Sequence, residues 1–153
     1  MKAIFVDVDG VLNNEAWADD VVRSDGYDPY DVDELCPHNL KNLFNIWKAT
    51  NPLVIISSSW RWDREALKAL TTQFKNYHIP INGFTIMEPL TTLSREKEIA
   101  LYLKQHPEIT NYCILDDMPI EDPHMKPHHI KTTLRFGLTK EDTIKAIGVL
   151  TNE

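Results

Sequence analysis

Two pairs of aspartates stand directly after apolar runs that are typical of buried strands. Asp7 and Asp9 close one run near the N-terminus, and Asp116 and Asp117 close another. Packing four carboxylates together is costly unless a cation neutralises them. Oxygen-only ligands suit Mg²⁺, which commonly takes one or two carboxylates, waters and a substrate phosphate. The pattern therefore predicts an Mg²⁺ site, of the kind that also accepts a substrate phosphate.

The spacing around the first pair supports this prediction. In a regular strand, residues i and i+2 project to the same side, so Asp7 and Asp9 can serve one site. Gly10 follows and lets the backbone turn tightly beside a ligand. A third apolar run ends in Ser57 and Ser58, which adds hydroxyl groups to the candidate site.

The elements that must position these residues alternate between strand and helix. We expect strands at 2–8, 53–56, 83–87, 111–115 and 129–133, and helices at 38–50, 63–75, 94–105 and after Thr139. Continuous apolar strands alternating with helices indicate an α/β protein, here a three-layer Rossmann-like fold with a mainly parallel sheet of about five strands. Ligands of such sheets bind outside the carboxyl ends of the strands, which is where the acids and Ser57 stand.

The acidity of the chain is concentrated in one segment. The net charge is −7, and residues 15–34 hold eight acids and one base. We expect residues 13–37 to form an acidic flap or loop inserted in a single domain spanning 1–153. An acidic protein gains no counterion-release attraction to nucleic acid, so strong duplex binding is not expected. No long apolar window or secretory signal is found, and the two distant cysteines suit a reducing, cytoplasmic setting.

The ordered motifs resemble those of the haloacid dehalogenase (HAD) superfamily. Asp7-Val8-Asp9-Gly10-Val11-Leu12 is similar to its first motif, DxDGxL, and Ser57 resembles the second. Arg95 is the best match to the cationic third motif, with Lys97 as the alternative, and Asp116-Asp117 resembles the fourth. The stretches 56–61, 94–99, 114–117 and 137–139 further resemble a subgroup of small HAD domains related to those of RNA-repair proteins.

This resemblance implies a role for each residue. Asp7 would attack phosphorus to form an aspartyl-phosphate, and Asp9 would act as general acid and base. Mg²⁺ would be held by the Asp7 carboxylate, the Asp9 carbonyl and Asp116, with Asp117 binding directly or through water. Ser57 would donate to a phosphoryl oxygen, with Ser58 as its competitor. Arg95 would neutralise charge around the nucleophile and the phosphate.

The gaps between the motifs are too short for a large cap domain. An open site suits a substrate larger than a sugar phosphate, such as a nucleotide or a polynucleotide end, and the subgroup resemblance points the same way. No membrane association is expected, and the sequence carries no signal for the oligomeric state.

Several neighbouring residues admit two interpretations. Arg61 either contacts substrate or tethers a neighbouring acid, and Trp60 and Trp62 either stack on a base or pack in the core.

Further residues are candidates for the surroundings of the site. Lys97 is a further substrate-binding candidate, and Asn13 could reach the water shell of the metal. The histidines of the C-terminal part are expected at the rim of the site rather than on a metal: His124, His128 and His129.

Three functions are compatible with these residues. The favoured one is a Mg²⁺-dependent phosphomonoester hydrolase. The second is a catalytically silent domain that binds phosphate or metal for a partner protein. The third is a phosphotransferase, which differs only in what attacks the aspartyl-phosphate.

Overall fold

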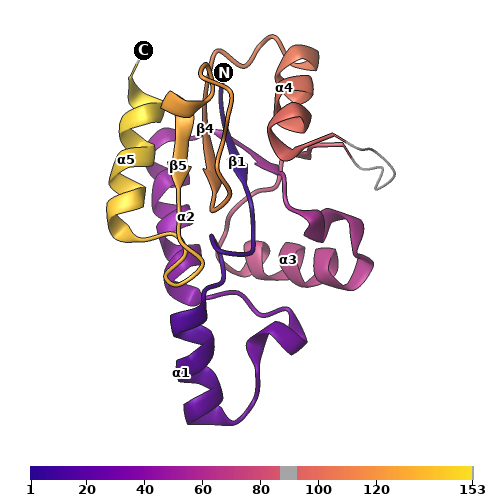
Figure 1. Cartoon of the computed structure of the whole chain (residues 1–153), viewed down its shortest axis with the longest axis vertical. Helices are drawn as coiled ribbons and strands as arrows, with labels where there is room; N and C mark the ends of the chain where they lie inside the picture. The colour runs from indigo at the N-terminus through magenta and orange to yellow at the C-terminus, as the bar shows by residue number, and fades with distance from the viewer. Residues whose placement is uncertain (87–92, 153) are drawn as a thin grey trace.

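One parallel sheet organises the chain, whose computed structural model describes residues 1–86 and 93–152 (Figure 1). In these residues the five strands have the order β3-β2-β1-β4-β5. Their bounds are β1 Lys2–Val6, β2 Leu53–Ile56, β3 Gly83–Phe84, β4 Asn111–Asp116 and β5 His129–Lys131. The prediction of an α/β fold with about five parallel strands is confirmed. The expected strand at 83–87 is shorter, and its last residue lies outside the described residues.

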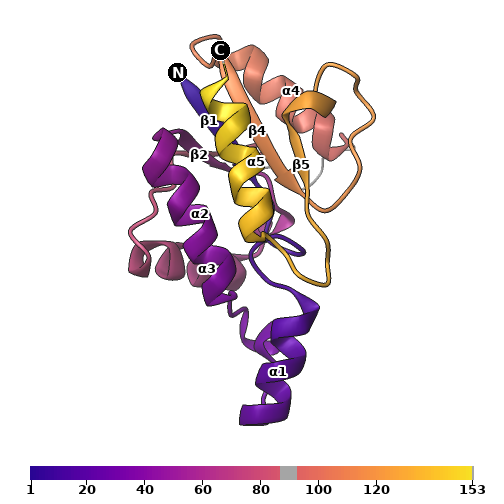
Figure 2. The ribbon, with the colours of Figure 1, turned by 90° about the vertical axis from the view of Figure 1, so that its left-hand side faces the viewer.

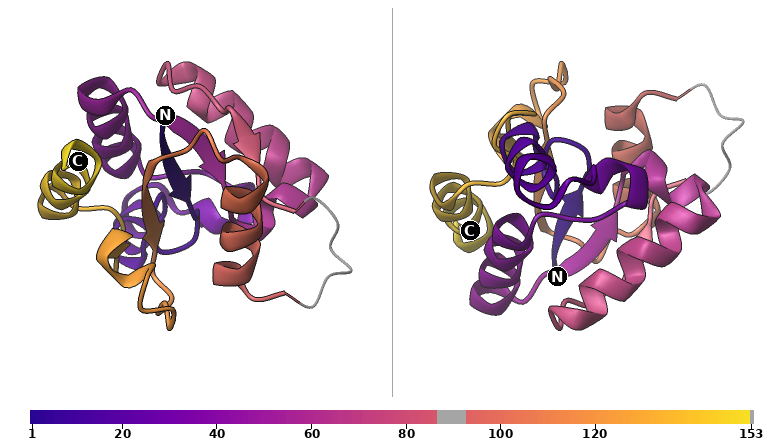
Figure 3. Two further views of the ribbon diagram at one scale, coloured as in Figure 1. Left: turned by 90° about the horizontal axis from the view of Figure 1, so that it is seen from above. Right: turned by 90° about the horizontal axis from the view of Figure 1, so that it is seen from below.

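Helices cover both faces of the sheet (Figures 2 and 3). Their bounds are α1 Glu15–Asp25, α2 Pro37–Thr50, α3 Arg64–Asn76, α4 Arg95–Gln105 and α5 Lys140–Thr151. Side chains of successive β1 residues alternate between two apolar clusters, as the period of a strand requires. Ile4 and Val6 pack with residues of α2, α3 and α5. Ala3 and Phe5 pack with Ile99 of α4 on the other face.

The acidic segment differs from its sequence prediction, because much of it is helical. The expected loop at 13–37 contains α1 and a 3₁₀ turn at Pro29–Val32. Asn14 caps α1 by accepting a hydrogen bond from the backbone N–H of Trp17 at 2.8 Å, and Gly26 ends the helix with a φ of 79°. These are standard start and stop signals, but the polar composition of the helix hides them. α1 projects beyond the end of the sheet in Figure 1.

The strand register brings the candidate site residues together. β1 lies between β2 and β4, and Val6 pairs with both Ile56 and Leu115. The next residue of each strand therefore reaches the same edge. The backbone N–H of Asp7 donates to the Leu115 carbonyl at 3.0 Å, and that of Ser57 donates to the Val6 carbonyl at 3.1 Å.

The described insertions are small. α1 and the 3₁₀ turn lie between β1 and α2, and α3 and β3 lie between β2 and α4, which agrees with the expected lack of a large cap. In the part of the chain that the structure describes, every helix is too short or too polar to span a membrane.

Candidate active site

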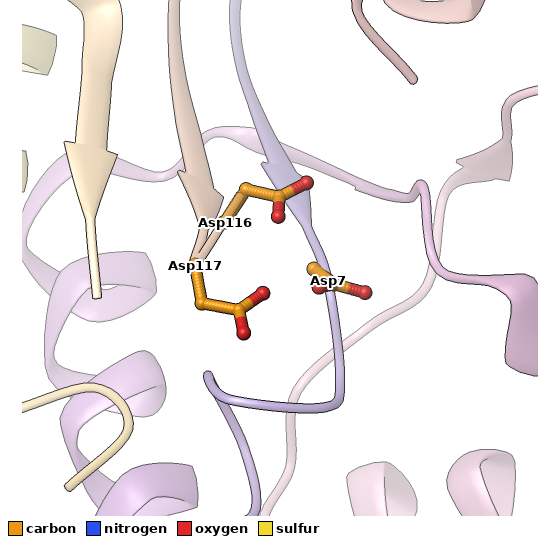
Figure 4. A group of neighbouring side chains, drawn as sticks. All are labelled: Asp7, Asp116 and Asp117. Atoms are coloured by element: carbon orange, nitrogen blue, oxygen red, sulfur yellow. The ribbon is translucent and has the colours of Figure 1, made fainter. Parts of the chain in front are cut away.

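Three carboxylates meet at the carboxyl ends of β1 and β4 (Figure 4). Asp7, Asp116 and Asp117 each offer an oxygen, and these oxygens lie within 4.8 Å of one another. Asp7 and Asp116 are buried, whereas Asp117 is half-buried. The structure thus brings three of the four predicted metal ligands together through their side chains.

Arg95, at the start of α4, reaches two of these carboxylates. Its Nη1 lies 3.1 Å from Oδ1 of Asp7 and 2.8 Å from Oδ2 of Asp116. The helix begins here because Ser94 caps it. Lys97, the alternative cation, has an exposed side chain further along the helix. Among the described residues, the ion pairs of the cluster therefore involve Arg95 and not Lys97.

The cluster holds more negative charge than Arg95 balances. Burial raises the pKa of Asp7 to about 7; the Arg95 guanidinium opposes this rise and the Asp116 carboxylate adds to it. Burial and Asp116 also raise the pKa of Asp117. Three close carboxylates, of which Asp7 and Asp117 have raised pKa values, offer only oxygen donors. Such a group is a suitable site for a hard divalent cation such as Mg²⁺. The predicted metal centre therefore fits the residues that are present.

Asp9 lies at the exposed side of the same turn. Its Oδ1 accepts a hydrogen bond from Nδ2 of Asn13 at 2.8 Å, and Nε1 of Trp60 lies 3.3 Å from each of its carboxylate oxygens. Asn13 also accepts from the Gly10 N–H at 3.1 Å. Asn13 and Trp60 thus orient the Asp9 side chain. The orienting function of Trp60 was not predicted, since its ring looks like a core or stacking residue in the sequence.

Gly10 permits the approach of the two acid pairs. Its φ is 78°, and a Cβ at this position would lie 2.5 Å from Oδ2 of Asp117. The hydroxyl of Thr132 donates to the Gly10 carbonyl at 2.5 Å and holds the turn from the β5 side. Thr132 was not among the predicted site residues, because a contact across 122 residues leaves no local signal in the sequence.

The two serine candidates have different surroundings. Ser57 is fully buried, and within residues 1–86 and 93–152 its Oγ has no hydrogen-bond partner. Oγ of Ser58 accepts from the Trp60 N–H at 3.1 Å and caps the following 3₁₀ turn, Ser59–Trp62. A buried hydroxyl without a partner costs free energy unless a ligand satisfies it. Ser57 is therefore the better placed of the two to meet a phosphoryl oxygen.

The predicted contact between Arg61 and substrate is wrong. The Arg61 side chain is completely buried and forms an ion pair with Glu98. It also donates hydrogen bonds to the backbone carbonyls of Ser57, Ser58 and Ile86. The alternative interpretation, a tether to a neighbouring acid, is the correct one. The sequence could not decide between them, because 37 residues separate Arg61 from Glu98.

His128 and His129 contact backbone carbonyl groups. A ring nitrogen of His128 lies 2.8 Å from the Tyr112 carbonyl oxygen, and one of His129 lies 3.0 Å from that of Asp116. Among the described residues, the group of acidic, histidine or cysteine side chains close enough to share a metal consists of the three aspartates.

Paired acids at the ends of two central parallel strands, with a hydroxyl and an arginine beside them, define a domain of the HAD superfamily. Residues 3–143 match the family of HAD domains found in Swiss Army Knife RNA repair proteins, and the chain belongs to this family. Searches of curated proteins and of solved structures found no match.

Proposed function

We propose that this domain is a Mg²⁺-dependent phosphomonoester hydrolase that acts through an aspartyl-phosphate on Asp7. The observation that carries the proposal is the position of Asp7. Its carboxylate is buried beside Asp116 and Asp117 and contacts Arg95. Ser57, at the end of the neighbouring strand β2, has a buried hydroxyl without a hydrogen-bond partner among residues 1–86 and 93–152. A nucleophilic carboxylate, an anion-binding cation and a free hydroxyl donor are the groups that phosphoryl transfer needs.

Each residue then has a defined task. Asp7 attacks phosphorus, and the bond to the leaving-group oxygen breaks as Asp9 gives that oxygen a proton. Asp9 then takes a proton from the water that attacks the aspartyl-phosphate, which releases inorganic phosphate and restores Asp7. Arg95 and Ser57 hold the phosphoryl oxygens during both steps.

The metal would be held by Asp7, Asp116, Asp117 and the backbone carbonyl of Asp9. When bound, Mg²⁺ supplies positive charge that screens the repulsion between the Asp7 carboxylate and the phosphate. Asp9 suits its proton-transfer task because it is exposed to solvent while Asn13 and Trp60 orient it. The protons it takes and gives can therefore exchange with water.

The substrate class we propose is the phosphorylated end of a nucleotide or polynucleotide. The family description, which names RNA repair proteins, and the small described insertions support this class. The acidic α1 segment opposes strong binding along a polymer, so the proposed contact is with the terminal phosphate.

We also propose a reducing cytoplasmic location. The two buried free cysteines, Cys36 and Cys113, are compatible with it.

A substrate panel tests this function. The wild-type protein is incubated with Mg²⁺ and an aryl phosphate, mononucleotides, sugar phosphates, or RNA with a 5′- or 3′-phosphate. We expect phosphate release that is highest with a nucleotide or an RNA end and absent in EDTA. Asp7→Asn should be inactive on every substrate, whereas Asp20→Asn, on the exposed face of α1, should match wild type on the aryl phosphate. Product carrying phosphate on an added alcohol would indicate a phosphotransferase, and no turnover of any substrate would favour the silent domain.

A further inference from the structure

Arg61 joins three segments that meet at the edge of the sheet. Its Nη1 donates to the carbonyl oxygens of Ser57 and Ser58 at 2.8 and 2.7 Å, and its Nε donates to that of Ile86 at 2.8 Å. Its Nη2 pairs with the carboxylate of Glu98. Four of the five guanidinium N–H groups are thus used, and both charged side chains are buried.

The segments joined in this way carry the groups that would bind the phosphoryl oxygens. Ser57 and Ser58 belong to the loop that follows β2. Glu98 lies on α4, three residues after Arg95, whose guanidinium contacts Asp7 and Asp116. The Arg61 side chain therefore connects the loop that carries Ser57 to the helix that carries Arg95.

The two carbonyl contacts also orient the loop backbone. In a planar trans peptide, C=O and the following N–H point in opposite directions, and all the described peptides are trans. Because Arg61 holds the Ser57 and Ser58 carbonyls, the N–H groups of Ser58 and Ser59 face away from it. These two N–H groups, together with the Ser57 hydroxyl, are donors that the loop can offer to an anion.

Stability alone is a poor explanation for this buried pair. Removing two charges from water costs free energy that their attraction does not always recover, and well-packed apolar replacements are often neutral or stabilising. A fixed arrangement of donors, by contrast, is valuable at a site where a misplacement of about 1 Å can cost about 100-fold in rate.

We propose that Arg61 and Glu98 are a positioning pair, which sets the Ser57–Ser59 loop and the Arg95 helix relative to each other so that both bind one phosphoryl group. This inference rests on the proposed function, because it names how the phosphate-binding half of that site is held. It assigns no contact between substrate and either residue.

Replacing the pair with apolar residues separates positioning from stability. In Arg61→Met/Glu98→Leu, both charges are removed together, so we expect unfolding at a temperature close to that of wild type. The kcat for an aryl phosphate should nevertheless fall about 100-fold. Mg²⁺ binding, followed by calorimetry, should be unchanged because Asp7, Asp116 and Asp117 are untouched. Recovery of wild-type kcat in this double variant would overturn the proposal.

A second variant keeps the test decisive if the double variant does not fold. Arg61→Lys retains the charge that pairs with Glu98, but a single ammonium nitrogen cannot reach acceptors on three segments. We expect a folded protein with reduced kcat, between that of wild type and that of the double variant. Arg64→Met, an exposed change three residues away, is the control and should have wild-type kcat. Wild-type kcat in Arg61→Lys would contradict the positioning role.

Orthovanadate, which mimics the phosphoryl group, gives a readout that does not need turnover. In the presence of Mg²⁺ it should bind wild type and Arg64→Met equally, and bind both Arg61 variants at least about tenfold more weakly. If wild type binds orthovanadate but hydrolyses no substrate, the proposed hydrolase function fails while the weaker binding still supports the pair. Equal binding by all variants overturns the pair, and no binding by wild type overturns both proposals.

Discussion

Arg95 and Asp7 meet across the carboxyl edge of the sheet, with Nη1 of the arginine 3.1 Å from Oδ1 of the aspartate. The contact links the start of α4 to the end of β1, two elements separated by most of the chain. It lowers the pKa of Asp7 against the effect of burial, and so keeps a larger fraction of the Asp7 carboxyl group ionised near neutral pH.

Removing Arg95 should therefore impair both charge balance and phosphate binding. We expect Arg95→Met to lower kcat/KM by about 100- to 1000-fold, and to shift the acidic limb of the pH–rate profile to higher pH because the Asp7 pKa rises. Lys97→Met is the matched comparison on the same helix, and its kcat/KM should stay within about twofold of wild type. Equal losses in the two variants would contradict the placement of Arg95 as the functional cation.

The raised pKa of Asp7 makes the stability of the metal-free protein depend on pH. Between the ordinary value of about 4 and the folded value of about 7, the folded state keeps a proton that the unfolded state has lost. The free energy of unfolding should therefore fall as pH rises through this window, by on the order of 1.4 kcal/mol per pH unit, and level off above it.

Asp7→Asn isolates this effect from that of other titrating groups. Chemical denaturation of both proteins in EDTA, from pH 4 to pH 8, gives the difference in unfolding free energy. The variant should be close to wild type at pH 4 and more stable at pH 8. A difference that does not change with pH would mean that folding leaves the pKa of Asp7 at its ordinary value.

Mg²⁺ should stabilise the folded protein, because it binds the assembled carboxylates and not the unfolded chain. At a concentration about 100-fold above Kd the stabilisation is about 2.7 kcal/mol, which differential scanning fluorimetry detects as a higher Tm. Asp116→Asn should abolish most of this shift, and Asp20→Asn should retain it. A full shift in Asp116→Asn would place the metal elsewhere.

Substitution of Gly10 should have two effects, a strained backbone and a clash with Asp117, and Gly26 serves as a control for the first. Gly10 and Gly26 have φ values of 78° and 79°, but an added Cβ clashes with Asp117 only at Gly10. Both alanine variants should lose about 1–2 kcal/mol from the left-handed backbone. Gly10→Ala should also weaken Mg²⁺ binding, measured by calorimetry, whereas Gly26→Ala should not. Equal Mg²⁺ affinity of Gly10→Ala and wild type would show that Mg²⁺ binding does not depend on the present position of Asp117.

The acidic helix should discriminate against polyanions. Asp20 and Asp25 lie on α1, which carries none of the assigned catalytic groups. We expect Asp20→Asn/Asp25→Asn to lower KM for a phosphorylated oligonucleotide more than for an aryl phosphate, with kcat unchanged. The difference should diminish as salt shortens the Debye length. Equally small changes in KM for both substrates at low salt would mean that the charge of α1 does not discriminate against polyanions.

Site residues were easiest to predict from the sequence where a polar or acidic side chain stands at the end of an apolar strand. Asp7 and Ser57 each follow a buried apolar strand, and Asp116 is the last residue of another. Parallel pairing brings such residues to one edge of the sheet. The existence of α1 was missed because polar residues dominate its composition, although Asn14 and Gly26 carry the capping signals.

The supporting contacts were harder to predict. Thr132 reaches Gly10, and Glu98 reaches Arg61, across long stretches of chain whose approach depends on the completed packing of β5 and α4. Nothing in the local pattern tells a buried arginine from one that meets substrate. These residues became visible only through their partners in the folded protein.

The proposed mechanism requires that Asp7 becomes covalently phosphorylated during turnover. The most direct measurement is a rapid acid quench of the wild-type protein with Mg²⁺ and excess substrate, followed by intact mass and peptide mapping. We predict the mass gain of one phosphoryl group, located on the peptide that contains Asp7 and removed by hydroxylamine, with no gain in Asp7→Asn. Turnover without a phosphorylated Asp7 peptide, or substantial activity in Asp7→Asn, would contradict the mechanism.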